Sequence, residues 1–249
     1  MEERNLLVEI AYNGSRYHGF QVQDNAVTVQ ETVQDAIERI LGKREDIIGC
    51  SRTDTGVHAN QYFFNLHTDN PIACERFLAA LNYHFPHDIA ALSCRQVSPE
   101  FHARYHTKEK EYVYKILNSP IKDPFSHDLL FQYPYPLDVE KLNRAAGYFL
   151  GEHDFKAFCT KDFKVRPAVR TIYKSEVRRE GNLVTYTVSG NGFLYNMVRI
   201  MTGTLLRVAQ GKIDPDAIPA ILESRDRARA GITAPACGLY LNRISYERM

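Results

Sequence analysis

The stretch VRTIYKSEVRREGNLVTYTVSG, residues 169–190, has the pattern of a β-hairpin. Val, Ile, Thr and Tyr recur through residues 169–178 and 183–190, a composition that favours extended strands. Between these strands, Glu180-Gly181-Asn182 supplies residues that are typical of a tight turn. Strands joined this closely pair antiparallel, so the stretch predicts a hairpin in the second half of the chain.

Strand and helix patterns alternate on both sides of this hairpin. Further strands are predicted over residues 6–12, 47–50, 57–66, 89–97 and 110–117. Helices are predicted over residues 29–41, 73–83, 138–150, 193–209 and 216–224, and Thr28 with Glu31 is typical of a helix N-cap. Each half therefore mixes helices with hairpin-connected strands, which predicts an α+β chain of two similar lobes with mostly antiparallel sheets.

A proline-rich stretch separates the two halves. It contains Ser119-Pro120, Asp123-Pro124 and Pro134-Tyr135-Pro136. Repeated proline interrupts helices and strand ladders alike, so this stretch is interpreted as a connection. The predicted organisation is an N-terminal lobe at residues 1–118, a connection at 119–136 and a C-terminal lobe at 137–249.

The composition is that of an ordinary globular protein. The chain has 249 residues, 44% of them hydrophobic, and 31 basic against 30 acidic residues, for a net charge of +1. This argues against disorder and against a small disulfide-rich protein. The five cysteines form no C-x-x-C pair, and no apolar run approaches the roughly 20 residues that span a bilayer. We therefore expect a cytoplasmic protein with no signal peptide, disulfide framework or membrane segment.

Local charge differs from the near-neutral total. Residues 160–179 hold seven basic residues against two acidic ones, with Phe163 and Tyr173 between them. Residues 102–115 form a second basic stretch that includes Arg104, Lys108 and Lys110. Clustered cations suit a phosphate backbone, although a solvated strand face remains an equally good interpretation of either stretch alone.

The densest polar turn is Arg52-Thr53-Asp54-Thr55-Gly56. Asp followed two residues later by Gly favours a tight turn that presents the carboxylate at the end of a strand. The guanidinium of Arg52 favours the ionised carboxylate that a nucleophile or base needs. The alternative is that Asp54 only forms an Asx-turn and Arg52 is surface charge.

Two further positions combine polar and apolar character. Strand alternation places Lys110, Tyr112 and Tyr114 on one face, where the two rings either stack on a base or pack in a half-buried strand. In the predicted helix after Gly192, Arg199 lies among apolar residues. That position favours an anionic partner, with a side chain that reaches out to solvent as the alternative.

Common cofactor motifs are absent from the sequence. It contains no G-x-x-x-x-G-K-[ST], G-x-G-x-x-G, H-E-x-x-H or G-x-S-x-G pattern. His102 and His106 have a possible metal spacing, but no cysteine or acidic pair accompanies them. We therefore expect no metal, nucleotide or flavin cofactor.

Residues 49–59, GCSRTDTGVHA, resemble the catalytic motif of the tRNA pseudouridine synthase A (TruA) family. Other parts of the chain fit that family in order: Tyr12-Asn13-Gly14, residues 19–23, Lys110-Glu111-Tyr112-Val113-Tyr114, residues 151–155, Val169-Arg170-Thr171-Ile172, Gly192-Phe193-Leu194, Met197-Val198-Arg199, Thr233-Ala234-Pro235 and Gly238-Leu239. The resemblance thus covers nearly the whole chain. Two departures are Cys50-Ser51, where the family usually has small residues with Gly, and residues 160–168.

The resemblance implies two α+β lobes whose sheets join into one long sheet, with helices on one side and a central basic cleft. It implies an isomerase that converts uridine to pseudouridine at nucleotides 38, 39 and 40 of the tRNA anticodon stem-loop, without a cofactor. It also implies a homodimer in which one tRNA contacts both subunits.

Residue roles follow from the same resemblance. Asp54 would be the nucleophile, attacking either the ribose or the pyrimidine ring. Tyr112 would stack on the target base and serve in proton transfer, and Arg199 would pair with the Asp54 carboxylate. Arg52 would fill the space that the flipped nucleotide leaves. Arg170, Lys110, Lys161 and Lys164 are the further residues expected to bind the RNA.

Three alternatives remain open at this stage. The first is an RNA-binding protein of the same fold without catalysis. The second is a metal-dependent nuclease, and the third is a related synthase that acts on another RNA.

Overall fold

A computed structural model describes residues 3–160 and 168–246 of the chain. The chain divides into two compact units, and each is described by itself. The first comprises Met1–Lys108 with Leu241–Met249, and the second comprises Glu109–Tyr240. Within the described residues, no helix has both the length and the apolar character needed to cross a membrane.

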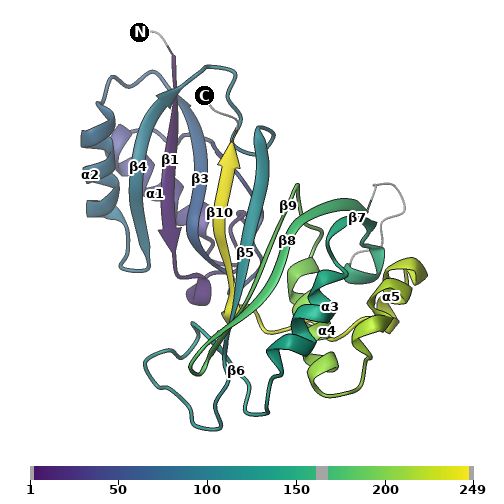
Figure 1. Cartoon of the computed structure of the whole chain (residues 1–249). Coiled ribbons are helices and arrows are strands. Elements are labelled where there is room, and N and C mark those ends of the chain that lie inside the picture. Colours follow the sequence, from purple (N-terminus) through teal and green to yellow (C-terminus); the bar gives the residue numbers. More distant parts are fainter. Residues whose placement is uncertain (1–2, 161–167, 247–249) are drawn as a thin grey trace. The chain divides into compact units, whose positions relative to one another are not determined.

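The first unit is built on antiparallel strands with two helices (Figure 1). Its elements are β1 (Arg4–Tyr12), α1 (Val29–Leu41), β2 (Ile47–Gly49), β3 (His58–Thr68), α2 (Cys74–His84) and β4 (Ile89–Val97). β1 pairs antiparallel with both β3 and β4, and β2 pairs antiparallel with β3. Residues 241–246 of β10 (Leu239–Tyr246) lie beside β3, where the Ile244 amide donates to Oε1 of Gln61 at 2.9 Å.

The core of this unit follows from the alternation along β1 and β3. The register places Leu6, Val8 and Ile10 opposite Leu66, Phe64 and Tyr62, all six of them inaccessible to solvent. Side chains two residues apart share one face of a strand, so these six form a continuous apolar layer. The predicted strands of this half are therefore confirmed.

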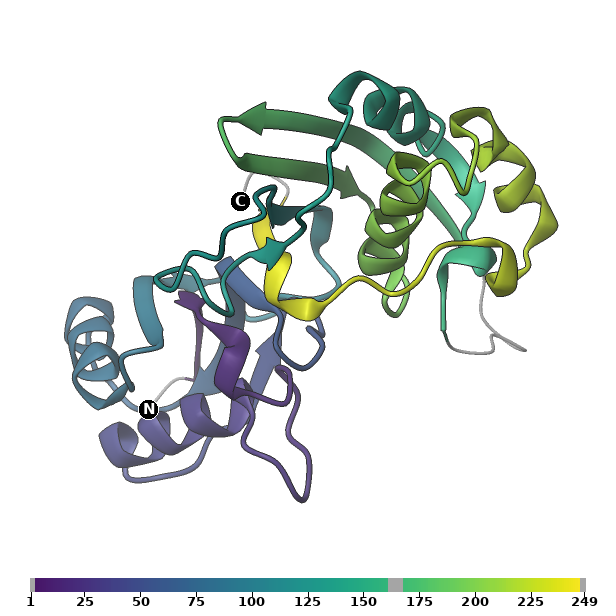
Figure 2. The same cartoon turned by 90° about the horizontal axis from the view of Figure 1, so that it is seen from below.

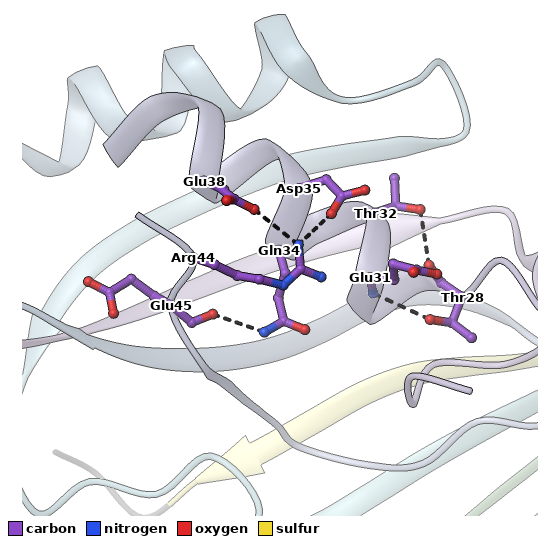
Figure 3. Close-up of polar contacts among 8 residues, drawn as sticks. All are labelled: Thr28, Glu31, Thr32, Gln34, Asp35, Glu38, Arg44 and Glu45. Atoms are coloured by element: carbon purple, nitrogen blue, oxygen red, sulfur yellow. Dashed lines mark hydrogen bonds and ion pairs between the residues drawn. The ribbon is translucent and has the colours of Figure 1, made fainter. Parts of the chain in front are cut away.

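The N-terminus of α1 has the predicted cap (Figure 3). Oγ1 of Thr28 accepts from the Glu31 amide at 3.3 Å, which satisfies one of the amides that a helix start leaves without a helical partner. The Thr28 side chain is completely buried. This cap fixes where the chain leaves the loop of residues 13–28 and enters the helix.

An ion pair joins Arg44, in the segment after α1, to two carboxylates of the helix (Figure 3). Nη1 of Arg44 lies 2.6 Å from Oδ1 of Asp35 and 3.2 Å from Oε2 of Glu38. All three side chains are about half exposed to water, which screens their attraction. The cap therefore stabilises the helix more than the ion pair does.

The second unit contains the hairpin predicted at residues 169–190. Its elements are β5 (Thr107–Leu117, which begins in the first unit), β6 (Phe131–Gln132), α3 (Val139–Gly147), β7 (Gly151–Asp154), β8 (Val169–Glu180), β9 (Leu183–Gly190), α4 (Met197–Ala209) and α5 (Ile218–Ser224). The strand order is β5-β9-β8-β7, antiparallel throughout, and β6 adds to β5 in parallel. The predicted α+β class with mostly antiparallel sheets is confirmed.

The β8–β9 hairpin turns at Gly181, whose φ of 59° lies in the left-handed region that favours glycine. α3 contacts both β8 and α4 (Figure 2). It is held to β8 by Asn143, whose side-chain amide bonds both the carbonyl and the amide of Val177, each at 2.7 Å. One side chain thus replaces the strand partner that Val177 lacks on that side.

Several predicted boundaries differ from the structure. The predicted helix at 193–209 begins at Met197, because Asn196 has a left-handed backbone (φ 60°) and a turn joins the Met197 amide to the Leu194 carbonyl. The helix predicted from residue 216 begins at Ile218, after a 3₁₀ turn at Pro215–Ala217. The strands β6, β7 and β10 were not predicted. β6 has two residues and β7 has four, too few for a periodic pattern, whereas β10 has eight.

The compact units are bounded differently from the predicted lobes at 1–118 and 137–249. The division falls inside β5, after Lys108, and inside β10, after Tyr240. The strand β5 therefore groups mainly with the second unit, since β9 pairs along it from Lys110 to Leu117. The predicted connection contains β6 and groups with the second unit too.

The cap and the ion pair of α1 provide a first test. We expect Thr28→Ala to lower the free energy of unfolding by about 1 kcal/mol, because the Glu31 amide loses its acceptor. Arg44→Gln, the control, removes the ion pair to the same helix and should cost less than about 0.5 kcal/mol. Urea denaturation followed by circular dichroism measures both, and equal losses would contradict the ranking.

Candidate active site

The predicted turn at Asp54 lies between β2 and β3. The Val57 amide donates to the Asp54 carbonyl at 3.1 Å, and Gly56, at the third position, has a φ of 76°. Thr55 has no positive φ, so this is the pattern of a type II turn, which requires glycine at the third position. The Asp54 side chain is half-buried and Arg52 is exposed.

Backbone groups of residues 17–20 hold this turn from one side. The Phe20 amide donates to the Thr53 carbonyl and the Gly56 amide to the Tyr17 carbonyl, both at 3.2 Å. Gly19, with a φ of 87°, approaches so closely that a Cβ there would lie 2.5 Å from the Thr53 carbonyl oxygen. The position of the turn thus depends on a glycine far away in the sequence.

Buried side chains of β1 and β3 contact the residues just before Asp54. The Tyr62 hydroxyl donates to the Ser51 carbonyl, and the Tyr62 ring stacks on Phe20 at 4.2 Å. The Tyr12 and Thr53 hydroxyls lie 2.9 Å apart in a buried hydrogen bond. These contacts leave little freedom for the backbone that carries Asp54.

His58 of the same motif has a structural role. Its side chain is 1% exposed, and its Nδ1 accepts from the Gly14 amide at 3.0 Å. A Cβ at Gly14 would lie 2.0 Å from the Val57 carbonyl oxygen, so these two segments also pack backbone to backbone. No role of His58 or Gly19 could be predicted from the local sequence, because both act through contacts between distant segments.

Tyr112 and Tyr114 of β5 have different surroundings within the second unit. The Tyr112 side chain is 7% exposed, and its ring meets Phe193 edge-on with centroids 5.1 Å apart. Tyr114 is completely buried, and its hydroxyl donates to the Pro235 carbonyl at 2.7 Å. Burial raises the pKa of Tyr114 far above its usual value. Tyr114 therefore belongs to the core, as the packing interpretation expects.

Arg199 of α4 is held by two acceptors in the second unit. Its Nε donates to the Ala234 carbonyl at 2.7 Å and its Nη1 to Oδ1 of Asn196 at 2.9 Å. The Ala234 amide in turn donates to the Arg199 carbonyl at 3.1 Å. These contacts fix the plane of a half-buried guanidinium, which does not reach freely into solvent.

The segment at residues 231–235 lies directly on the backbone of α4. A Cβ at Gly203 would lie 1.8 Å from the Ile232 carbonyl oxygen, so only glycine fits there. The Gly231 amide donates to Oγ1 of Thr204 at 2.8 Å. This close packing brings the Ala234 carbonyl within reach of Arg199.

Part of the basic stretch at residues 160–179 is engaged within the second unit. Lys174 lies 3.6 Å from a carboxylate oxygen of Glu111, and Arg178 lies 2.8 Å from Glu176. Arg179 donates to the side chain of Asn118 and to a backbone carbonyl, at 2.8 and 3.0 Å. The local excess of charge therefore overstates the number of cations available to an RNA phosphate.

The remaining predicted RNA contacts are placed as follows. Arg170 of β8 donates from Nη1 to the Val169 carbonyl at 2.6 Å, and partial burial lowers its pKa. Lys110 of β5 lies opposite Gly190 of β9 and is partly exposed. Lys161 and Lys164 lie outside the described residues. Among the residues that the structure describes, no group of three or more His, Cys, Asp or Glu could hold a metal ion.

Comparison with known proteins assigns the chain to a family. A family profile described as "tRNA pseudouridine synthase" matches residues 9–106 and 145–247, which include Asp54 and Arg199. The chain belongs to the tRNA pseudouridine synthase family. The predicted activity, that of an isomerase that modifies tRNA, is thereby confirmed.

Relatives agree over nearly the full length. The chain is 44% identical to "tRNA pseudouridine synthase A" of Thermoanaerobacter sp. (strain X514) and 46% identical to that of Acetivibrio thermocellus, in each case over 98% of this chain and 100% of the relative. A solved structure, "Crystal Structure of a Cbf5-Nop10-Gar1 Complex", is 12% identical with a TM-score of 0.36 over 96% of this chain and 59% of that one. That likeness is too low to add to the family assignment.

Two glycines with similar backbones test the support of the Asp54 turn. Gly19 and Gly42 have φ values of 87° and 74°, but a Cβ at Gly42 meets no atom within 4 Å. Ala at either position should cost about 1 kcal/mol of stability or more through backbone strain. Only Gly19→Ala should also displace Thr53 and lower pseudouridine formation, by about tenfold or more, because catalytic groups tolerate little displacement.

The measurement is tritium release from a tRNA transcript labelled at uridine C5, with thermal unfolding of both variants in parallel. Equal activity in Gly19→Ala and Gly42→Ala would show that the turn does not depend on this contact.

Proposed function

We propose that this synthase isomerises uridine at nucleotides 38, 39 and 40 of the tRNA anticodon stem-loop, with Asp54 as the nucleophile. The observation that carries the proposal is the Asp54 turn, a half-buried carboxylate on a backbone that is hydrogen-bonded on both sides. A nucleophile must be held close to its target atom, and a pinned turn at the end of a strand provides that restraint.

The reaction needs no oxidant or reductant. The bond between ribose C1′ and uracil N1 breaks, the ring turns, and a bond forms between C1′ and C5. The C5 hydrogen leaves as a proton and N1 gains one, so atoms and electrons balance. Asp54 attacks either the ribose or the pyrimidine ring, and both routes require the ionised carboxylate.

The other proposed roles follow the chemistry of each side chain. Tyr112 stacks on the target base and serves in proton transfer, and Arg199 stabilises the Asp54 carboxylate. The fixed guanidinium plane supports the latter role, because a preorganised donor costs less to bring to a carboxylate than a mobile one.

The proposed RNA contacts lie at the surface or in basic stretches. Arg52, which is exposed, occupies the space of the flipped nucleotide. Arg170, Lys110, Lys161 and Lys164 bind phosphates. The enzyme acts as a homodimer, with one tRNA contacting both subunits.

Replacement of the proposed nucleophile is the first test. We expect Asp54→Asn to abolish tritium release from the C5-labelled transcript while tRNA affinity stays within about tenfold, because affinity comes mostly from phosphate contacts. Asp69→Asn, which changes an exposed aspartate of the same unit, is the matched control and should retain activity.

The outcomes of this experiment separate the alternatives. Tritium release by Asp54→Asn at the wild-type rate would exclude the nucleophile, and affinity lost in proportion to activity would assign Asp54 to binding. Binding without release by the wild type would indicate a passive RNA-binding protein. Strand cleavage that a chelator stops would indicate a nuclease.

The sites of modification are tested in cells. In tRNA from cells that lack this protein, we expect pseudouridine to be lost at nucleotides 38, 39 and 40. Loss at other positions, with the anticodon arm unchanged, would replace the proposed substrate with another RNA site.

The salt dependence of binding tests whether local charge holds the RNA. Despite a net charge of +1, the logarithm of tRNA affinity should fall steeply with the logarithm of salt concentration, by about 0.9 for each phosphate neutralised. Equilibrium binding between about 50 and about 200 mM salt measures the slope. A flat dependence would show that clustered cations do not carry the interaction.

A further inference from the structure

A stacked pair of rings lies outside the proposed active-site residues, in the turn between β4 and β5. The Tyr105 side chain is 77% exposed, which is unusual for a large aromatic ring. Its ring stacks on that of His102, with centroids 4.1 Å apart and planes inclined by 28°. We refer to these two residues as the Tyr105–His102 platform.

The backbone beneath the platform is fixed by buried hydrogen bonds. Ala103 has no exposed surface, its amide donates to Oδ1 of Asn65 at 2.9 Å, and its carbonyl accepts from the Tyr246 hydroxyl at 2.9 Å. Asn65 is itself fully buried and donates to Asn5, which donates to the Phe101 carbonyl at 2.9 Å. Ala103, between the two rings of the platform, and Phe101, just before them, are therefore part of the core of the first unit.

Hydrogen bonds also fix the orientation of the His102 ring. Its Nδ1 accepts from the backbone amides of Arg104 and Tyr105, at 3.2 and 3.3 Å, so this nitrogen carries no proton. Burial lowers the pKa of His102, and the nearby charges of His106 and Arg104 lower it further. A neutral, immobile ring thus supports one face of Tyr105.

The segment that carries the platform holds basic residues. Arg104 and Lys108 are both exposed, and no acidic residue occurs between Phe101 and Lys108. The flanking Glu100 accepts a hydrogen bond from Ser98. An exposed aromatic ring with cations beside it has the two elements that single-stranded RNA sites combine, a stacking surface and charges for the backbone.

We propose that Tyr105, supported by His102, stacks on an unpaired base of the tRNA, and that Arg104 and Lys108 bind the phosphates beside that base. The proposal rests on the proposed function only for the identity of the RNA. A rigid platform suits this role, because little side-chain freedom is lost when the base stacks.

The test compares two substitutions at Tyr105 with one substitution at a matched control tyrosine. Tyr105→Ala removes the ring, whereas Tyr105→Phe keeps it. Tyr83 is the control, since it is 84% exposed on the same unit and also lies against a histidine, but edge-on to His84 at 5.1 Å. The probe is an unmodified tRNA transcript, measured by equilibrium binding and by tritium release with each protein.

We expect Tyr105→Ala to weaken tRNA binding about tenfold, in line with the loss of one stacked base. Tyr105→Phe and Tyr83→Ala should bind as wild type does. The salt slope of Tyr105→Ala should match the wild type. Arg104→Gln and Lys108→Gln should each reduce the slope by about 0.7, as expected for one phosphate of a single strand. Wild-type affinity in Tyr105→Ala would overturn the proposal, as would equal losses in the Ala and Phe variants.

The two readouts keep this proposal separate from the proposed function. Tritium release by the wild type, with no effect of Tyr105→Ala on affinity or on kcat/KM, rejects the platform and leaves the synthase activity intact. Binding without tritium release, with a loss specific to Tyr105→Ala, rejects the activity and keeps the platform.

Discussion

The position of Asp54 depends on the direct approach of two backbones without side chains between them. Gly19 contacts the Thr53 carbonyl and Gly14 contacts the Val57 carbonyl, at distances that no Cβ would permit. Hydrogen bonds from Phe20 to Thr53 and from Gly56 to Tyr17 then become possible, and they fix the turn on both sides of the carboxylate. Because backbone groups have no rotamers, this restraint holds the turn more firmly than side-chain contacts of the same number.

The second unit uses the same device at Arg199. Gly203 lets the Ile232 carbonyl lie against α4, and the segment that follows presents the Ala234 carbonyl to the guanidinium. In both units a residue proposed for catalysis is positioned by a neighbouring segment that packs through glycine. The support therefore comes from precise chain geometry more than from added polar contacts.

Features that depend on neighbouring residues in the chain could be predicted from the sequence. The β8–β9 hairpin and the Thr28 cap depend on neighbouring residues, and both were predicted from the sequence. The start of α4 was not, since the apolar spacing from Phe193 suits a helix although Asn196 adopts a left-handed backbone. The role of Gly19 could not be predicted from spacing, because it depends on a segment more than thirty residues away. The turn at Asp54 followed from its residues, while its proposed role as nucleophile came from the family resemblance. His102 and His106 matched a metal spacing, yet each accepts backbone hydrogen bonds through Nδ1.

The place of β10 affects how the chain folds during synthesis. Residues 241–246 complete the first unit beside β3, and Tyr246 bonds the Ala103 carbonyl under the Tyr105–His102 platform. A ribosome delivers these residues only after the whole second unit has been translated. β2 covers only residues 64–66 on that side of β3, so the rest of this edge stays uncovered while 132 residues, Glu109–Tyr240, are added. An uncovered strand edge is prone to wrong pairing, so the growing chain is exposed to aggregation for longer than an N-terminal unit that closes on itself.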